Sequence, residues 1–218
     1  MMRQSAIDKS SELAAPELAA LKSFLQSAGL TGAHLEIGTA AGGTLKEMML
    51  AYESPRPRFI AVDTFRYFPD QRSIVEDNLR SAGIHLADVE LRASSSDAAL
   101  HAAVEAGEHF DFVFIDANHE ARHVIRDLRW AELLTEGGAL CLHDYSPRFP
   151  GVIWAVDRFL RNNRNYRRVG LTHSLLTLQK TAPSRGREIS RFDIFVADVI
   201  SQFHRLRRSL RKRLGRPV

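Results

Sequence analysis

Residues 34–44 read HLEIGTAAGGT, an apolar run that passes through a glycine-rich turn into a helical pattern. Gly38 and Gly42 lack a Cβ, so the backbone there can adopt a positive φ and pass close to a ligand. The helix that follows offers free N–H groups at its start. A dinucleotide-binding turn needs the spacing G-x-G-x-x-G, but Ala40 stands two residues after Gly38. The stretch therefore predicts a strand-to-helix turn that holds a nucleotide-like cofactor other than a dinucleotide.

The 218-residue chain contains 44% hydrophobic residues, enough for one sizeable core and a single domain with short extensions. No apolar stretch follows the first residues, and no run approaches the roughly 18 apolar residues of a membrane span. The single cysteine, Cys141, lies in the apolar run ALCL, which leaves no disulfide framework and no cysteine-rich metal site. We therefore expect a soluble protein of the reducing cytoplasm.

Charge is distributed unevenly along the chain. Residues 1–182 carry 20 basic and 23 acidic residues, a net charge of −3, whereas residues 183–218 carry 10 basic and 3 acidic residues, a net charge of +7. The first part therefore has no general basic surface for nucleic acid, and we expect no nucleic-acid partner. Any surface that faces a polyanion belongs to the C-terminal segment.

Short apolar runs alternate with helical patterns, which indicates βα units and a mostly parallel sheet. Five strands are expected in this pattern, at residues 35–37, 59–62, 89–92, 110–115 and 139–143. Helices are expected before, between and after them, at residues 11–28, 44–52, 71–82, 97–106, 120–134 and 151–162. Gly137-Gly138 is expected to stop the fifth of these helices.

Two further segments, 167–171 and 175–179, predict a hairpin at the end of the sheet. The predicted fold is thus α/β: a Rossmann-like, doubly wound, mostly parallel sheet of seven strands with a C-terminal antiparallel hairpin, flanked by helices. We divide the chain into an N-terminal helical extension at 1–30, a cofactor-binding domain at 31–182 and a basic amphipathic C-terminal helix at 183–218.

Acidic residues end three of the expected strands: Asp63, Asp116 and Asp144. Ligands of open α/β sheets bind outside the carboxyl ends of the strands, so we expect these carboxylates to converge on one crevice. Asp63 either accepts hydrogen bonds from both hydroxyls of a ribose or caps a turn. The pair Ser95-Ser96 either touches an adenine or caps the next helix, since serine caps helices well. A fourth acid, Asp127, is expected to pair with a neighbouring arginine at the surface, outside this crevice.

Three motifs carry a family resemblance. Residues 36–42 form E-x-G-x-x-x-G, which resembles motif I of class I S-adenosylmethionine (SAM) methyltransferases, whose ligand has a cationic methionine end. The segments FVFIDANH at 112–119 and LLTEGGALCLHDY at 133–145 then follow in order. Over about residues 31–180 the chain is similar to the macrocin, mycinamicin and rhamnosyl O-methyltransferases, which typically show I-D-G-D-H and G-G-x-x-x-x-H/D/E-D at these places.

Three residues match this family pattern: Asp116, His119 and Asp144. The chain departs from the pattern at four positions: Ala117, Asn118, Ala121 and His143. The first two replace a Gly-Asp pair, the third replaces a common aromatic residue, and the fourth stands where many members have a carboxylate.

The resemblance implies transfer of a methyl group from SAM to a hydroxyl of a sugar-containing or other small-molecule acceptor. It implies that Asp116 and Asp144 hold a divalent cation, Mg²⁺ or Mn²⁺, and that His119 is the general base, since a cation lowers the pKa of a coordinated oxygen while a histidine takes its proton. His143 is either a third ligand, which favours Mn²⁺ because Mg²⁺ prefers oxygen, or a strand-end residue bonded to a loop. Ten residues are expected to hold SAM: Glu36, Gly38, Thr39, Gly42, Gly43, Thr44, Asp63, Ser95, Ser96 and Asp116.

Three other functions are weighed against this one. Amino methyltransferases of nucleic acids or proteins often carry an Asn/Asp-Pro-Pro-aromatic motif after strand four, and the sequence DANH at 116–119 does not fit it. A hydroxylase of the cephalosporin type resembles this fold and uses other cofactors. A SAM-binding module without catalysis is the third, against which the presence of Asp116, His119 and Asp144 argues.

Apolar residues recur every three or four positions in the C-terminal segment, beside a cluster of basic residues at 205–213, which predicts a basic amphipathic helix. Its apolar stripe can pack on the chain's own core, cross to a second subunit in a homodimer, or lie on an anionic membrane at the inner face. We expect the half up to residue 203 to be docked and the Arg-rich half to protrude. The stripe comprises Phe192, Phe195, Val196, Val199, Ile200, Phe203, Leu206, Leu210 and Leu214.

Overall fold

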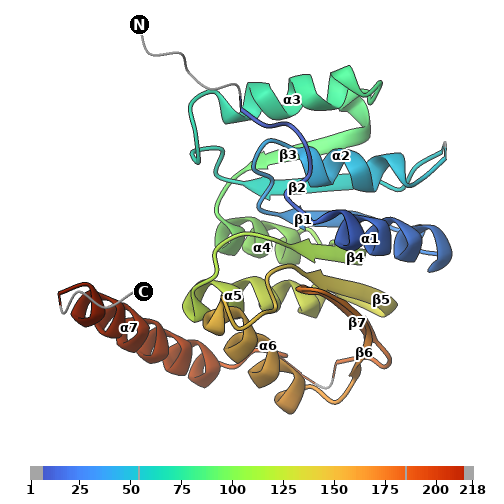
Figure 1. Ribbon diagram of the computed structural model, residues 1–218. Coiled ribbons are helices and arrows are strands. Elements are labelled where there is room, and N and C mark those ends of the chain that lie inside the picture. The colour runs from blue at the N-terminus through green and yellow to red at the C-terminus, as the bar shows by residue number, and fades with distance from the viewer. Residues whose placement is uncertain (1–6, 54, 185, 214–218) are drawn as a thin grey trace, which may run out of the picture.

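A seven-stranded sheet forms the centre of the computed structural model, which describes residues 7–53, 55–184 and 186–213 (Figure 1). Its strands are β1 (His34–Ile37), β2 (Phe59–Asp63), β3 (Val89–Ala93), β4 (Phe110–Ile115), β5 (Leu134–Leu142), β6 (Tyr166–Thr172) and β7 (Leu175–Lys180). They lie in the order β3-β2-β1-β4-β5-β7-β6, in which β1 to β5 pair in parallel and β7 runs antiparallel to both of its neighbours. This confirms the predicted doubly wound fold with a C-terminal hairpin.

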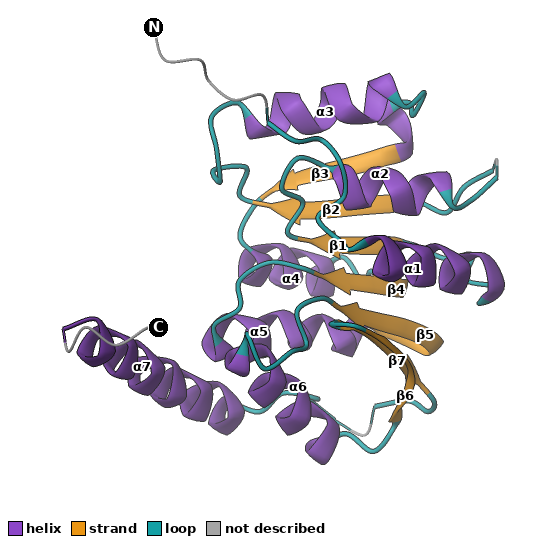
Figure 2. Ribbon diagram, in the orientation of Figure 1, coloured by secondary structure: helices purple, strands orange, loops and turns teal. Residues whose placement is uncertain are grey.

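Helices cover both faces of the sheet (Figure 2). They are α1 (Ala15–Ser27), α2 (Gly43–Leu50), α3 (Gln71–Ser81), α4 (Ser96–Glu105), α5 (Ala121–Asp127), α6 (Pro150–Asn162) and α7 (Arg191–Arg213), with 3₁₀ turns at Leu86–Asp88 and Leu128–Leu133. Residues of α1, α2 and α3 pack against Phe112 on one face, and residues of α4, α5 and α6 pack with Trp130 on the other. α7 lies outside α5 and α6. No described helix combines the length and the hydropathy that a membrane crossing requires.

Alternation along β1 decides which residue faces the candidate site. Leu35 and Ile37 belong to the core beneath α4, α5 and α6, and successive residues of a strand point to opposite faces. Glu36 therefore points to the other face, where it lies in register with Ala61 of β2 and Phe114 of β4. A carboxylate is thus placed in the middle of the sheet, two residues before Gly38 of the glycine-rich turn.

The predicted helix at 120–134 is wrong in its second half. α5 ends at Asp127, a 3₁₀ turn follows, and β5 begins at Leu134. The pairing of β4 with β5 shifts between Phe110 and Phe112, so that Gly137-Gly138 lies in a bulge of the strand and stops no helix. A Cβ on Gly138 would lie 2.9 Å from the carbonyl oxygen of Asp111, which leaves room only for glycine as the two strands approach.

The first and last helices also differ from the prediction. α1 begins at Ala15 instead of residue 11, and residues 8–12 form an irregular segment before it. In α7 the buried positions include Ala197 and Ser201, whereas much of the predicted apolar stripe is exposed. Of the three alternatives for the stripe, packing on the chain's own core does not hold for these residues: Phe192, Phe195, Val199, Phe203 and Leu206. Leu214 and the side chain of Leu210 lie outside the described part of the chain.

Candidate active site

The glycine-rich turn holds the carboxyl ends of β1 and β4 together. Gly38 has φ +85°, and a Cβ there would clash with the carbonyl oxygen of Asp116, so no other residue fits. Gly42, with φ +78°, is the residue before α2, and its N–H donates to the carbonyl oxygen of Thr39 at 2.7 Å. The turn therefore places the start of α2 above the sheet edge at which Asp116 follows β4.

Glu36 is a buried acid with both carboxylate oxygens lacking a hydrogen-bond partner among the described residues. Burial raises its pKa well above the ordinary value of 4.5, the nearby Thr39 side chain opposes this without reversing it, and the negative charges of Asp116 and Asp63 act in the same direction as burial. An unpartnered carboxylate in a protein interior is costly unless a cation or a donor satisfies it. The ammonium of the methionine end of SAM is a group of the required charge and donor capacity, so this residue fits the cofactor that the sequence predicts.

Asp63 ends β2 beside this turn. Its two carboxylate oxygens accept hydrogen bonds from the backbone N–H of Thr39, at 2.9 Å, and of Phe65, at 2.7 Å. Each oxygen keeps further acceptor capacity, so the turn role and the predicted ribose role are compatible. Ser95 is the N-cap of α4, while the Ser96 hydroxyl accepts a hydrogen bond from the Trp130 indole at 2.9 Å. Contact of either serine with an adenine stays a prediction.

The segment before α1 covers the start of α2. The Ser11 hydroxyl lies 2.8 Å from the Thr44 hydroxyl, and Asn78 donates to the carbonyl oxygen of Lys9 at 2.7 Å. A Cβ on Gly43 would clash with the backbone of Ser10. Contact of Gly43 and Thr44 with a cofactor stays a prediction, and it would require this N-terminal segment to move.

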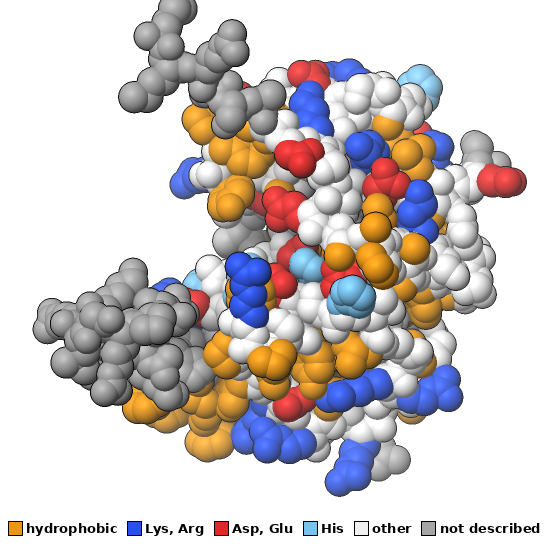
Figure 3. All heavy atoms as spheres, in the orientation of Figure 1, with side chains coloured by type: hydrophobic (Ala, Val, Ile, Leu, Met, Phe, Trp, Pro, Cys, Tyr) orange, Lys and Arg blue, Asp and Glu red, His pale blue; other side chains and the backbone are white. Residues whose placement is uncertain are grey.

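An acidic cluster with one imidazole lies at the ends of β4 and β5. Asp116, His143 and Asp144 each offer a ligand atom, and these atoms lie within 4.8 Å of one another. His143 Nδ1 is 3.3 Å from Asp116 Oδ1 and 3.7 Å from Asp144 Oδ2. Asp144 has φ +61°, a strained conformation for a residue with a Cβ, of the kind that clusters at functional sites. Figure 3 shows acidic and histidine side chains beside a hollow at the middle of this face.

Glu17 of α1 belongs to this cluster and was missed by the sequence analysis. It is buried, accepts hydrogen bonds from the backbone N–H and hydroxyl of Ser174 at 2.8 and 2.7 Å, and approaches His143 Nε2 at 3.3 Å. Burial lowers the pKa of His143, but the hydrogen bond to Asp116 and the charges of Asp116, Asp144 and Glu17 outweigh it and raise that pKa to about 9. Three carboxylates around His143 therefore create a position that favours a positive charge.

His119 stands at the open side of the cluster. Its Nε2 lies 2.6 Å from Asp144 Oδ2, but the angle of this contact does not allow a hydrogen bond. The His119 side chain is 40% exposed. Its ring stacks on Phe149, with centroids 4.2 Å apart and planes 29° apart. The imidazole is thus fixed by a ring on one side and a carboxylate on another, an arrangement suited to accepting a proton from a bound molecule. The structure brings the predicted base and all three predicted metal ligands together.

Comparison with known proteins assigns a family and agrees with the fold. The chain matches a family model described as "Methyltransferase domain" over residues 35–145. No curated sequence matches the chain. The solved structures that share its fold include the O-methyltransferase from Bacillus cereus in complex with SAH, at TM-score 0.61 and 20% identity, covering 78% of this chain and 83% of that one.

Two further solved structures have the same fold. The O-methyltransferase TomG from Streptomyces achromogenes, in complex with SAM, has TM-score 0.64 and 20% identity over 78% of this chain and 82% of that one. A TDP-rhamnose 3'-O-methyltransferase of calicheamicin biosynthesis has TM-score 0.61 and 17% identity over 75% of this chain and 78% of that one. Since the family match runs from β1 to the residue after Asp144 and spans half of the chain, this protein belongs to the methyltransferase domain family.

Proposed function

We propose that the protein transfers the methyl group of SAM to a hydroxyl of a sugar-containing or other small-molecule acceptor, with a divalent cation at the site. The observation that carries the proposal is the position of Glu36, a buried carboxylate without a partner that lies close enough to Asp116 and Asp63 to share their electrostatic field. On this proposal the same edge of the sheet would hold both a cationic cofactor and a divalent cation. The solved structures that share this fold include several O-methyltransferases, which supports a hydroxyl acceptor.

On this proposal the two ends of the cofactor meet different acids. Glu36 pairs with the ammonium of the methionine end, in a buried position where a charge-assisted bond is strong. Asp63 accepts from the ribose hydroxyls with the oxygen lone pairs that Thr39 and Phe65 leave free. Holding the methyl donor and the acceptor in line contributes much of the rate, because it removes the entropy cost of their encounter.

The acceptor side is assigned to the cluster after β4 and β5. Asp116, His143 and Asp144 would hold the cation, which when bound lowers the pKa of a hydroxyl oxygen. A mixed set of two carboxylates and one imidazole favours Mn²⁺ over Mg²⁺, because Mg²⁺ prefers oxygen ligands. His119 takes the hydroxyl proton at an imidazole nitrogen, and the carboxylate of Asp144 beside it stabilises the charged ring that results.

The test uses labelled SAM with a panel of sugars, glycosides and catechols, with and without a chelator. His119→Ala should lower turnover by roughly 10²–10⁴-fold, the usual scale of general base catalysis, while calorimetry shows unchanged SAM binding. His101→Ala is the matched control, since His101 is an exposed histidine on α4 that faces only Glu105. Full activity of His119→Ala would refute the base, activity indifferent to exhaustive chelation would refute the metal, and a wild-type chain that binds neither SAM nor its demethylated product would refute the proposed function.

A further inference from the structure

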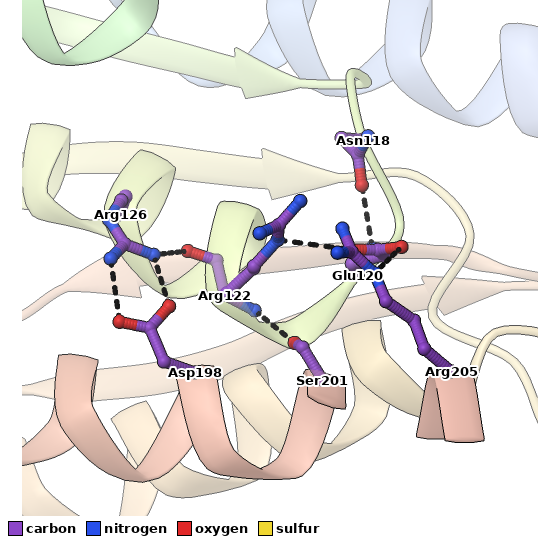
Figure 4. Close-up of polar contacts among 7 residues, drawn as sticks. All are labelled: Asn118, Glu120, Arg122, Arg126, Asp198, Ser201 and Arg205. Carbon is purple, nitrogen blue, oxygen red and sulfur yellow. Dashed lines mark hydrogen bonds and ion pairs between the residues drawn. The ribbon is translucent and has the colours of Figure 1, made fainter. Parts of the chain in front are cut away.

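α7 docks on the protein through a side that combines small and apolar residues with polar ones. Ala197 and Ser201 are buried against α5 and α6, and Ile194 and Ile200 pack beside them at the edge of the core. Figure 4 shows the polar contacts of this interface: Asp198 with both terminal nitrogens of Arg126 at 3.0 and 2.9 Å, Ser201 with the backbone N–H of Arg122 at 2.9 Å, and Arg205 with Glu120 at 3.0 and 2.6 Å. The orientation of α7 about its own axis is therefore fixed by several directed contacts.

The opposite side of α7 carries the apolar residues outward. On a helix of 3.6 residues per turn, positions 192, 195, 199, 203 and 206 share one side, opposite Ala197 and Ser201. Their side chains form an exposed apolar face: Phe192 63%, Phe195 63%, Val199 49%, Phe203 61% and Leu206 60% exposed. Isolated exposed apolar residues are ordinary, but a continuous stripe of this kind marks an interaction surface.

The C-terminal segment carries a strong excess of basic over acidic residues. Residues 183–218 contain only three acidic residues, and each is used inside the protein: Glu188 with Lys180, Asp193 with Arg158, and Asp198 with Arg126. The same segment contains ten basic residues, six of them at 205–213. No acidic side chain of the segment therefore remains for a partner, and the complementary surface is an anionic one.

A second copy of this chain fits the exposed face less well. It would bring a segment with a net charge of +7 against another of the same charge. A stable interface buries about 800 Å² on each partner, whereas five partly exposed side chains of this size offer on the order of 500 Å². Neither the like charge nor the small area counts against an anionic lipid surface. An interfacial helix inserts its Phe and Leu side chains into the bilayer while its Lys and Arg residues contact the headgroups.

We propose that α7 is a membrane-surface helix whose exposed apolar face inserts into an anionic lipid bilayer while its other side stays docked on α5 and α6. The C-terminal end of α7 extends past the sheet on the side to which the carboxyl ends of the parallel strands point (Figure 1). The inference does not depend on which acceptor the enzyme methylates.

The test is flotation of the full-length protein with phosphatidylcholine vesicles, with and without phosphatidylglycerol. We expect binding only to the anionic vesicles and a loss of binding at high salt, since exposed charge interactions are screened. The double substitution Phe195→Ser with Val199→Ser should weaken partitioning at least roughly tenfold. The matched control is Val104→Ser with Leu171→Ser, which removes two exposed apolar side chains elsewhere on the surface.

Two results would overturn the proposal. One is a wild-type chain that binds neutral and anionic vesicles equally, or binds neither. Calorimetry must show that the same preparation binds SAM, so that a lack of vesicle binding is not due to a failure to fold. The other is a concentration-dependent dimer in analytical ultracentrifugation that the Phe195→Ser with Val199→Ser variant abolishes, since the apolar face would then belong to a second copy. Unchanged SAM binding by that variant shows that the fold is intact, so a loss of flotation in it supports the lipid assignment.

Discussion

Substitution of Glu36 by glutamine separates folding from cofactor binding, because the two should change in opposite directions. The Glu36 carboxylate is fully buried between β2 and β4, and no described residue donates a hydrogen bond to it. A buried polar group left unsatisfied costs about 1–3 kcal/mol, and a charged one costs more. Glu36→Gln removes the charge and keeps the shape, so the cofactor-free protein should become more stable by about 1–3 kcal/mol at neutral and alkaline pH.

The pH dependence has a definite sign. The pKa of Glu36 is raised in the folded protein above its ordinary value of 4.5. The stability associated with this group is therefore fully present below pH 4.5 and is lost as the pH rises through the raised pKa. Glu36→Gln should therefore change the free energy of unfolding little in acid. As the pH rises above 4.5, the variant should become increasingly more stable than the wild type. SAM binding should change in the opposite direction, because Glu36→Gln removes one partner of a buried charge pair. The loss of one such partner costs about 2–4 kcal/mol, which is roughly a 30- to 700-fold loss of SAM affinity.

Thermal unfolding at two pH values and calorimetry with SAM measure both effects on the same preparations. In a chain of this size 1 kcal/mol corresponds to roughly 2–4 °C in melting temperature. Glu105→Gln is the matched control, because its side chain is 69% exposed on α4 and should move neither quantity. If Glu36→Gln lowers the melting temperature of the cofactor-free protein at high pH and binds SAM as tightly as the wild type, the assignment of Glu36 is wrong.

The sheet and its crevice follow from local patterns, and this explains why they are predictable. Each strand is a short apolar run, and the acids that follow β2, β4 and β5 lie at the same edge because parallel strands end there. Gly38 is required because the carbonyl oxygen of Asp116 approaches it closely, and the presence of a glycine in the sequence already indicates such a close approach. Asp116, His143 and Asp144 converge because β4 and β5 are neighbours in the sheet.

Residues whose environment comes from distant parts of the chain are not predictable in this way. Glu17 looks like a helix-capping residue, since it accepts from the backbone N–H of Ala14, but its other oxygen binds Ser174, 157 positions later. The sequence predicts that Asp127 pairs at the surface, yet Asp127 is buried at the end of α5, with the Ser96 side chain beside it. No local signal reports either contact.

The face on which α7 docks shows the same limit. Amphipathic periodicity predicts that the side with Phe192 and Phe195 is buried, and the structure exposes it. The helix is oriented instead by ion pairs of its two acids, Asp193 with Arg158 and Asp198 with Arg126, and by the small Ala197, which allows close approach. Partners on α5 and α6 thus outweigh the apolar pattern, and sequence periodicity contains no information on them.

Two further predictions concern buried or turn-forming acids. Asp63→Ala should lower SAM affinity by about 1–3 kcal/mol, through loss of a charge-assisted bond, and calorimetry that finds unchanged affinity would exclude the ribose role. Asp127→Asn tests burial alone, since burial raises the pKa of Asp127 from 3.8 to about 7. Because the folded-state pKa is raised, the wild type is most stable below the ordinary pKa and loses stability as the pH rises from about 4 through 7, by up to about 4 kcal/mol for a shift of this size. Urea unfolding should therefore find the Asn variant close to the wild type near pH 4 and clearly more stable at pH 8. Glu105→Gln, at an exposed position of α4, is the control and should leave the stability unchanged at both pH values. Equal pH profiles for wild type and Asp127→Asn would mean that Asp127 is ionised in the folded protein, and that a donor compensates its burial.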